Sequence, residues 1–189
     1  MSDKQKKRRS LLSVALFLVA VAVFLVGLVF VIRQLAFPKA YESIVQEYSS
    51  YYEIDENFIF AVINTESGFD ENAVSDVGAS GLMQIMEDAF LWTKKHLDAV
   101  HTDISYEDIM SPEYNVEYGC CMLSYYYEKY DSYELSAAAY HAGTNQVDKW
   151  IAEGVISIDD FDCDDIPSDA TSHYVKKVMR AYKAYEYLY

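Results

Sequence analysis

An uncharged apolar run near the N-terminus sets the first limit on the fold. Residues 11–32 contain no charged side chain, and only Ser13 and Gly27 interrupt the apolar series. As a helix with a rise of about 1.5 Å per residue, the run is roughly 33 Å long and can cross a hydrocarbon core about 30 Å thick. Signal peptides have a shorter apolar region of roughly 7 to 15 residues and a small-residue cleavage site, which is missing here. We therefore predict an uncleaved signal anchor, with a cleaved signal peptide as the alternative.

Charge on either side of this run predicts its orientation. Five basic side chains precede it: Lys4, Lys6, Lys7, Arg8 and Arg9. Because basic residues favour the cytoplasmic side, the remainder of the chain is expected outside the cell membrane. The predicted organisation is a cytoplasmic tail over 1–10, a transmembrane anchor over 11–32, a linker over 33–40 and an extracytoplasmic domain over 41–189.

The part after the anchor has the size and charge of one acidic domain. From Arg33 onward about 157 residues remain, with 10 Lys and Arg against 29 Asp and Glu, a net charge near −19. One core can be built from this length, and the charge argues against nucleic acid or an anionic bilayer as the main ligand. Three cysteines form no disulfide framework, so free buried thiols are expected, although Cys163 could pair with Cys120 or Cys121.

Apolar spacings of three, four and seven predict helices throughout this domain. One begins near Ala40, and the next is capped by Asp55 and ends at Gly68, which places Glu66 in its last turn. Further helices are predicted over 87–98, 113–130, 135–142 and 171–188, with a short one closing at 154. Alternating strand patterns are not evident, so the predicted class is mainly α, with at most a small β hairpin near the bend at Gly78 and Gly81.

Glu66 is the candidate catalytic acid. Residues 66–86 read ESGFDENAVSDVGASGLMQIM, in which a carboxylate at a helix end precedes a glycine-rich bend and an apolar turn. Glycosidic cleavage needs an acid that stays protonated near neutral pH, and an apolar setting raises the pKa of a carboxyl group. Ile63 and Phe69 flank Glu66 in the sequence. We therefore expect a carboxyl with a raised pKa beside a sugar-binding cleft.

Four separated blocks resemble the signature of the soluble lytic transglycosylases, relatives of the goose-type lysozymes. The blocks read ES at 66–67 followed by GASGLMQIM at 78–86, NVEYG at 115–119, AAAYHAG at 137–143, and IP at 166–167 with YV at 174–175. The resemblance implies a lysozyme-like transglycosylase domain that acts on peptidoglycan. It also implies that the Tyr140 hydroxyl hydrogen-bonds Glu66. The implied substrate-binding residues are Ser67, Ser75, Gly81, Leu82, Gln84, Met86, Tyr140, His141 and Tyr174.

Three positions depart from the family pattern. Glu87 stands where the family usually has proline, and both residue types suit a first helical turn. His141 stands where asparagine is usual, and Ala170 where an acidic residue is usual, although Asp169 could substitute by a one-residue shift. The last two departures concern the binding groove, so they leave its contacts open.

The resemblance implies cleavage of the β-1,4 bond between N-acetylmuramic acid and N-acetylglucosamine, with formation of a 1,6-anhydro end. Glu66 would act first as acid and then as base. Two alternatives are a hydrolytic muramidase that uses Asp70 or Asp76 as a second carboxylate, and a non-catalytic glycan-binding scaffold. No cofactor or metal is expected, because the four histidines lack ligand spacing and the acidic run at 160–165 lacks the calcium-loop glycine. Peptidoglycan strands and the membrane are the expected partners; the sequence names no protein partner.

Overall fold

The structure is a computed structural model that describes residues 3–189, with side chains from Leu12 onward. The basic side chains of the predicted cytoplasmic tail therefore lie outside the described part. The chain divides into an N-terminal unit that ends at Pro38 and a domain that begins at Lys39. Each unit is described by itself.

The N-terminal unit is one long helix, α1 (Asp3–Leu35). Its segment Leu12–Leu35 is long and apolar enough to cross a membrane by length and composition. The helix continues past the predicted end at Ile32 because Arg33, Gln34 and Leu35 all favour helical conformation. The connection before the domain is correspondingly shorter than the predicted linker over 33–40.

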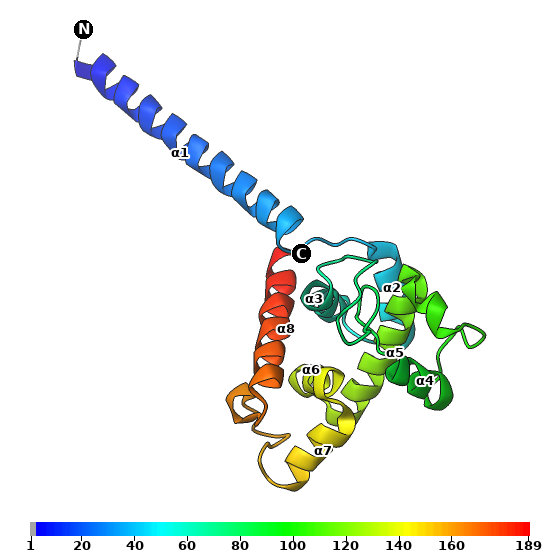
Figure 1. Ribbon diagram of the computed structural model, residues 1–189. Coiled ribbons are helices and arrows are strands. Elements are labelled where there is room, and N and C mark those ends of the chain that lie inside the picture. Colours follow the sequence, from blue (N-terminus) through cyan, green and yellow to red (C-terminus); the bar gives the residue numbers. More distant parts are fainter. Residues whose placement is uncertain (1–2) are drawn as a thin grey trace. The chain divides into compact units, whose positions relative to one another are not determined.

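Helices make up the domain, as the sequence predicts (Figure 1). They are α2 (Glu42–Tyr52), α3 (Glu56–Glu66), α4 (Glu87–His96), α5 (Pro112–Tyr130), α6 (Tyr133–Ala142), α7 (Thr144–Ala152) and α8 (Asp169–Leu188), with 3₁₀ turns η1 (Tyr106–Met110) and η2 (Cys163–Asp165). The predicted boundaries differ from these by two residues or fewer at most ends, because local capping determines them. Asp55, for example, accepts from the Asn57 N–H at 2.7 Å at the start of α3.

The central helix of the domain is α5, which packs against α2, α4, α6 and η1. Its side chains Tyr118 and Leu123 are fully buried, as are Phe58 and Phe60 of α3. Tyr185 of α8 lies 5.6 Å from Phe60, ring centroid to ring centroid, and closes the core from the C-terminal end of the chain. Burial of large aromatic side chains supplies the main driving force for this packing.

The predicted hairpin near the glycine-rich bend is reduced to two isolated antiparallel bridges. Val74 pairs with Ser80, and Ser80 pairs with Ile85, without an extended strand among residues 3–189. All three cysteines are free thiols, of which Cys120 and Cys121 are buried and Cys163 is half-buried.

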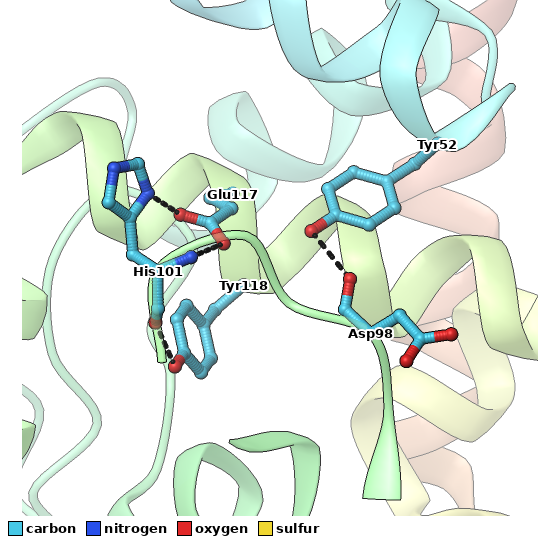
Figure 2. A network of polar contacts seen from close by, with 5 residues as sticks. All are labelled: Tyr52, Asp98, His101, Glu117 and Tyr118. Atoms are coloured by element: carbon cyan, nitrogen blue, oxygen red, sulfur yellow. Dashed lines mark hydrogen bonds and ion pairs between the residues drawn. The ribbon is translucent and has the colours of Figure 1, made fainter. Parts of the chain in front are cut away.

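A buried polar network fixes the segment between α4 and η1 (Figure 2). The Glu117 carboxylate is fully buried and accepts from both the backbone N–H of His101, at 2.8 Å, and its imidazole Nδ1, at 2.5 Å. The Tyr118 hydroxyl donates to the His101 carbonyl at 2.7 Å, and Tyr52 donates to the Asp98 carbonyl at 3.4 Å. The buried Glu117 carboxylate thus has two partners in this segment, as a buried charge requires.

Candidate active site

Glu66 is the last residue of α3, where the chain reverses direction. The reversal is made by Gly68 and Phe69, whose φ angles of 60° and 70° both lie in the left-handed region. Glycine adopts this conformation at little cost, so the prediction that Gly68 ends the helix is confirmed. The Glu66 side chain consequently lies at the junction between α3 and the bend that follows.

Ser67 fastens this helix end to the bend. Its hydroxyl oxygen accepts from the Phe69 N–H at 3.1 Å and donates to the Leu82 carbonyl at 2.7 Å. The Leu82 side chain is fully buried, so it packs beneath the bend rather than lining an open surface. In this conformation both residues support the site, although the sequence resemblance implied contacts with substrate.

The bend over 73–86 is held by hydrogen bonds within itself. Ser80 and Ile85 exchange backbone bonds of 3.0 Å in both directions, and the Gly81 N–H donates to the Ala73 carbonyl at 2.9 Å. The Gln84 side chain donates from Nε2 to the carbonyls of Ala73, at 3.0 Å, and Gly81, at 2.9 Å. The φ angle of Gln84 is 49°, in the left-handed region. Its side-chain amide thus stabilises the bend at a residue whose own backbone conformation is uncommon.

Ser75 and Met86, both predicted to bind substrate, lie at either end of this bend. The Ser75 hydroxyl oxygen accepts from the Ala79 N–H at 3.0 Å. Met86 is the N-cap residue of α4 and is 41% exposed, so its side chain is available to a ligand.

Asn115 on α5 supports the bend from below. Its carbonyl oxygen Oδ1 accepts from the Met83 N–H at 2.7 Å, and Nδ2 donates to the Ser80 carbonyl at 2.9 Å. A Cβ atom at Gly81 would lie 2.3 Å from this Nδ2, and the φ of Gly81 is 77°. Position 81 therefore requires glycine for two independent reasons. Gly81 is buried and acts through this packing.

Tyr106, which sequence reasoning missed, also contacts the bend. Its hydroxyl oxygen lies 2.9 Å from the Gly78 carbonyl, 2.8 Å from the Ile85 carbonyl and 3.2 Å from the Ser80 hydroxyl. No motif includes Tyr106, and its residue type carries no signal at the start of a 3₁₀ turn. Only the fold brings it to the bend.

The two tyrosines of the site have different partners from those implied by the sequence. The Tyr174 hydroxyl on α8 donates to Glu66 Oε1 at 2.6 Å. The Tyr140 hydroxyl on α6 donates to the Met83 carbonyl at 2.8 Å instead. The prediction that Tyr140 hydrogen-bonds Glu66 is therefore wrong, because the fold directs its hydroxyl to the Met83 carbonyl. Tyr140 still lies close to the acid, since the Glu66 charge contributes to raising its pKa.

Burial raises the pKa of Glu66 to about 7. The hydrogen bond from Tyr174 and the charge of Lys177 act in the opposite direction and favour the ionised form. Desolvation is the largest of the three effects, as the apolar sequence around Glu66 predicts. A carboxyl with this pKa is protonated in a substantial fraction of molecules at neutral pH and can act as a general acid.

The alternative second carboxylates are placed differently from Glu66. Asp70 and Asp76 are both exposed. The Asp70 carboxylate accepts from the Asn72 N–H at 3.0 Å, and neither aspartate is among the groups that shift the pKa of Glu66. Neither shares the desolvated environment of the acid.

His141 lies against Tyr174 and thus one residue away from the acid. The two ring centroids are 4.6 Å apart, and His141 Nδ1 lies 3.2 Å from the Thr171 hydroxyl oxygen. Burial lowers the pKa of His141, which favours the neutral imidazole. Ser168 in turn contacts the Thr171 hydroxyl at 3.1 Å, whereas Asp169 is exposed at the start of α8.

An open groove adjoins these residues. Its larger cavity, about 820 Å³, lies between α4, α5 and the junction of α6 with α7. Trp92 and Tyr125 line it, with ring centroids 5.3 Å apart. A smaller cavity of about 370 Å³ shares Ala142 and Gln146 with the larger one, so the two adjoin.

Chains of contacts link both cavities to the acid, although Glu66 itself lines neither. Tyr126 lines the larger cavity and packs edge-on against Tyr140, with centroids 6.4 Å apart. Thr171 lines the smaller cavity and contacts His141. One desolvated acid, a tyrosine that donates to it and a nearby aromatic groove are the parts that general acid catalysis on a bound glycan would need.

Comparison with known proteins gives the family. A family model described as the transglycosylase SLT domain matches residues 43–156, and the chain belongs to this family. The chain is 35% identical over 151 residues to the soluble lytic murein transglycosylase of Escherichia coli strain K12, covering 79% of this chain and 23% of that protein. It is 31% identical over 161 residues to a putative soluble lytic murein transglycosylase of Haemophilus influenzae, covering 82% and 26%. The chain thus spans about a quarter of the length of these relatives.

Solved structures agree with this assignment. The 70-kDa soluble lytic transglycosylase of Escherichia coli matches with a TM-score of 0.71 and 31% identity, over 80% of this chain and 25% of that chain. A complex of the 70-kDa soluble lytic transglycosylase with bulgecin A matches with a TM-score of 0.72 and 32% identity, over 80% of this chain and 25% of that chain. The predicted family and its mainly helical, lysozyme-like fold are confirmed.

Proposed function

We propose that this protein is a peptidoglycan lytic transglycosylase that cleaves the β-1,4 bond between N-acetylmuramic acid and N-acetylglucosamine. The observation that carries this proposal is Glu66, whose burial raises its pKa to about 7 and whose Oε1 accepts from the Tyr174 hydroxyl. Its similarity to lytic murein transglycosylases supports the same substrate class.

In the first step, protonated Glu66 donates its proton to the glycosidic oxygen. The bond from the anomeric carbon of the muramic acid to that oxygen breaks, and the oxygen leaves as the 4-hydroxyl of the glucosamine. The carbonyl oxygen of the substrate's own N-acetyl group bonds to the anomeric carbon and stabilises the positive charge. This step needs no second carboxylate of the protein, in keeping with the exposure of Asp70 and Asp76.

In the second step, ionised Glu66 takes the proton of the substrate's 6-hydroxyl. The 6-oxygen then bonds to the anomeric carbon, the acetamido oxygen leaves it, and the product carries a 1,6-anhydro ring. Glu66 returns to its protonated form, so the reaction consumes no water. A pKa near 7 suits both directions of proton transfer. Tyr174 holds the carboxyl in place through both steps by its hydrogen bond to Oε1.

The groove is the proposed binding site for the glycan strand. Sugar rings have apolar faces that pack on aromatic side chains, and Trp92 with Tyr125 offers such a surface. Gln146, which both cavities share, offers an amide for sugar hydroxyl groups. His141, Met86 and Gln84 complete the side nearer to the acid in this proposal.

We further propose that α1 anchors the protein in the cell membrane with residues 39–189 on the outer side. The length and composition of Leu12–Leu35 support a single span, and the preceding basic residues support this orientation. A reporter fused after Tyr189 should then be active only if it works outside the cytoplasm. Release of the protein with a new N-terminus near residue 38 would show a cleaved signal instead.

Turnover of purified peptidoglycan tests the proposed role of Glu66. Glu66→Gln keeps the shape of the side chain but has no acidic proton, so a loss of at least about a hundredfold is expected. Asp70→Asn is the matched control, since it removes an exposed carboxylate from the same turn, and it should retain near-wild-type turnover. Equal losses in both variants, or near-wild-type turnover of Glu66→Gln, would contradict the proposal.

A further inference from the structure

The Tyr106 hydroxyl joins the two ends of the glycine-rich bend. Its oxygen lies 2.9 Å from the Gly78 carbonyl oxygen and 2.8 Å from that of Ile85. Gly78 precedes the bridge between Ser80 and Ile85 in the chain, and Ile85 is one of its two members. A phenol has one proton, which two acceptors at these distances share. The ring packs against Phe90 of α4, with centroids 5.8 Å apart, so the hydroxyl is held in position.

The residues between these ends belong to the surroundings of Glu66. The Leu82 carbonyl accepts from Ser67, and the Met83 carbonyl accepts from Tyr140. The Leu82 and Met83 carbonyls are therefore tied to Ser67, the neighbour of Glu66, and to Tyr140, whose pKa the Glu66 charge helps to raise. Tyr106 holds Gly78 and Ile85, which flank this pair in the chain.

We propose that Tyr106 is a positioning residue for the acid: its hydroxyl keeps segment 78–85 of the bend closed and thereby holds the Leu82 and Met83 carbonyls in place for Ser67 and Tyr140. The consequence for catalysis rests on the proposed function. The consequence for the bend and for the environment of Glu66 does not.

Loosening the bend should act on Glu66 through its hydration. Burial is the largest cause of the raised Glu66 pKa, so water admitted when Ser67 and Tyr140 lose these fixed partners should lower it. The titratable groups that face Glu66 are Tyr174 and Lys177 on α8 and Tyr140 on α6. The Tyr106 hydroxyl contacts Gly78, Ser80 and Ile85 of the bend and none of these three groups.

Tyr106→Phe and Tyr118→Phe form a matched pair for the test. Each removes one tyrosine hydroxyl from a backbone carbonyl and keeps the ring. Tyr118 donates to the His101 carbonyl in the neighbouring segment, not to the bend (Figure 2). Thermal unfolding checks that both variants fold, and amide hydrogen exchange of Ser80 and Ile85 reports the closure of the bend directly.

The decisive readout is the pH titration of the Glu66 carboxyl carbon by NMR in full-length protein, with Glu66→Gln used to assign the signal. In Tyr106→Phe the midpoint should fall from about 7 toward the value of an exposed glutamate, about 4.3, and the two amides should exchange at least about tenfold faster. Tyr118→Phe should leave both unchanged. An unchanged midpoint in folded Tyr106→Phe, or the same fall in Tyr118→Phe, would overturn the inference.

Turnover separates this inference from the proposed function. If wild-type protein cleaves peptidoglycan, the alkaline limb of its pH–rate profile should move to lower pH in Tyr106→Phe and stay in place in Tyr118→Phe. If wild-type protein cleaves nothing while the Glu66 midpoint still falls in Tyr106→Phe, the positioning role stands and the proposed function fails.

Discussion

The Tyr174 hydroxyl donates to Glu66 Oε1 at 2.6 Å, although 108 residues separate the two in the chain. Glu66 ends α3, and Tyr174 lies in the second turn of α8, so the acid is complete only when the last helix has packed. The Tyr174 ring also packs against the His141 ring, with centroids 4.6 Å apart. One residue thus orients the acid and connects it to the groove.

Removing the Tyr174 hydroxyl should shift the ionisation of the acid upward. The hydrogen bond favours ionised Glu66, so Tyr174→Phe should raise its pKa above about 7 and move the alkaline limb of the pH–rate profile to higher pH. Turnover at the optimum should fall about tenfold because the carboxyl loses its fixed orientation. Tyr140→Phe is the control, since that hydroxyl contacts Met83, and an upward shift of the limb in this variant would count against the assigned partners.

Wild-type stability should depend on pH through Glu66. Its folded pKa of about 7 lies above the ordinary glutamate value of 4.5, so the folded state binds the proton more tightly. The resulting stabilisation is fully present below about pH 4.5 and is lost as pH rises through about 7. Glu66→Gln has no such dependence and should exceed wild type in free energy of unfolding by about 1–3 kcal/mol at pH 8 but not at pH 4. Denaturant unfolding at both pH values measures this; equal differences would contradict the assigned desolvation.

Substitutions at two glycines of the bend should separate the cost of backbone strain at positive φ from the cost of a steric clash of the new Cβ atom. Gly81→Ala places a Cβ 2.3 Å from Asn115 Nδ2, whereas Gly78→Ala meets nothing within 4 Å, and both have positive φ. Gly78→Ala should therefore cost about 1 kcal/mol of unfolding free energy, and Gly81→Ala roughly 2–4 kcal/mol with loss of turnover. Thermal unfolding compares them, and equal costs would mean that Asn115 gives way easily.

The aromatic wall of the groove should affect binding more than chemistry. Trp92→Ala removes a ring from the larger cavity without touching Glu66, so KM for glycan strands should rise about tenfold while kcat changes little. Tyr51→Ala is the control, because Tyr51 is an exposed ring outside this cavity. Should both variants bind glycan like wild type in a sedimentation assay, Trp92 would not line the binding site.

The sequence predicts the position of Glu66 but not its partner. The local signals for this helix are an apolar stripe, a cap at Asp55 and a stop at Gly68. The observed bounds of α3 agree with them. Which tyrosine reaches the acid depends on how α6 and α8 pack, a tertiary property that a motif does not encode. The resemblance consequently placed Tyr140 on Glu66, where the fold places Tyr174.

Other parts of the site lie beyond local pattern for the same reason. Tyr106 stands outside every recognisable block, yet the packing of η1 on α5 brings its hydroxyl to the bend. Leu82 lies within a block, but its burial shows that it supports the bend. A residue's position in a motif indicates that it lies near the site. Whether its side chain can contact a ligand depends on whether that side chain is exposed there.

The products of peptidoglycan digestion test the central claim most directly. Mass spectrometry of glycan fragments released by wild-type protein should show 1,6-anhydro-muramic acid ends, each lighter by one water than a hydrolysed end, and Glu66→Gln should release almost none. Digestion in water enriched in ¹⁸O should leave these new ends unlabelled, because the substrate's own 6-oxygen closes the ring. Labelled reducing ends in place of anhydro ends would show hydrolysis, and comparable release by Glu66→Gln would show that Glu66 is not the acid.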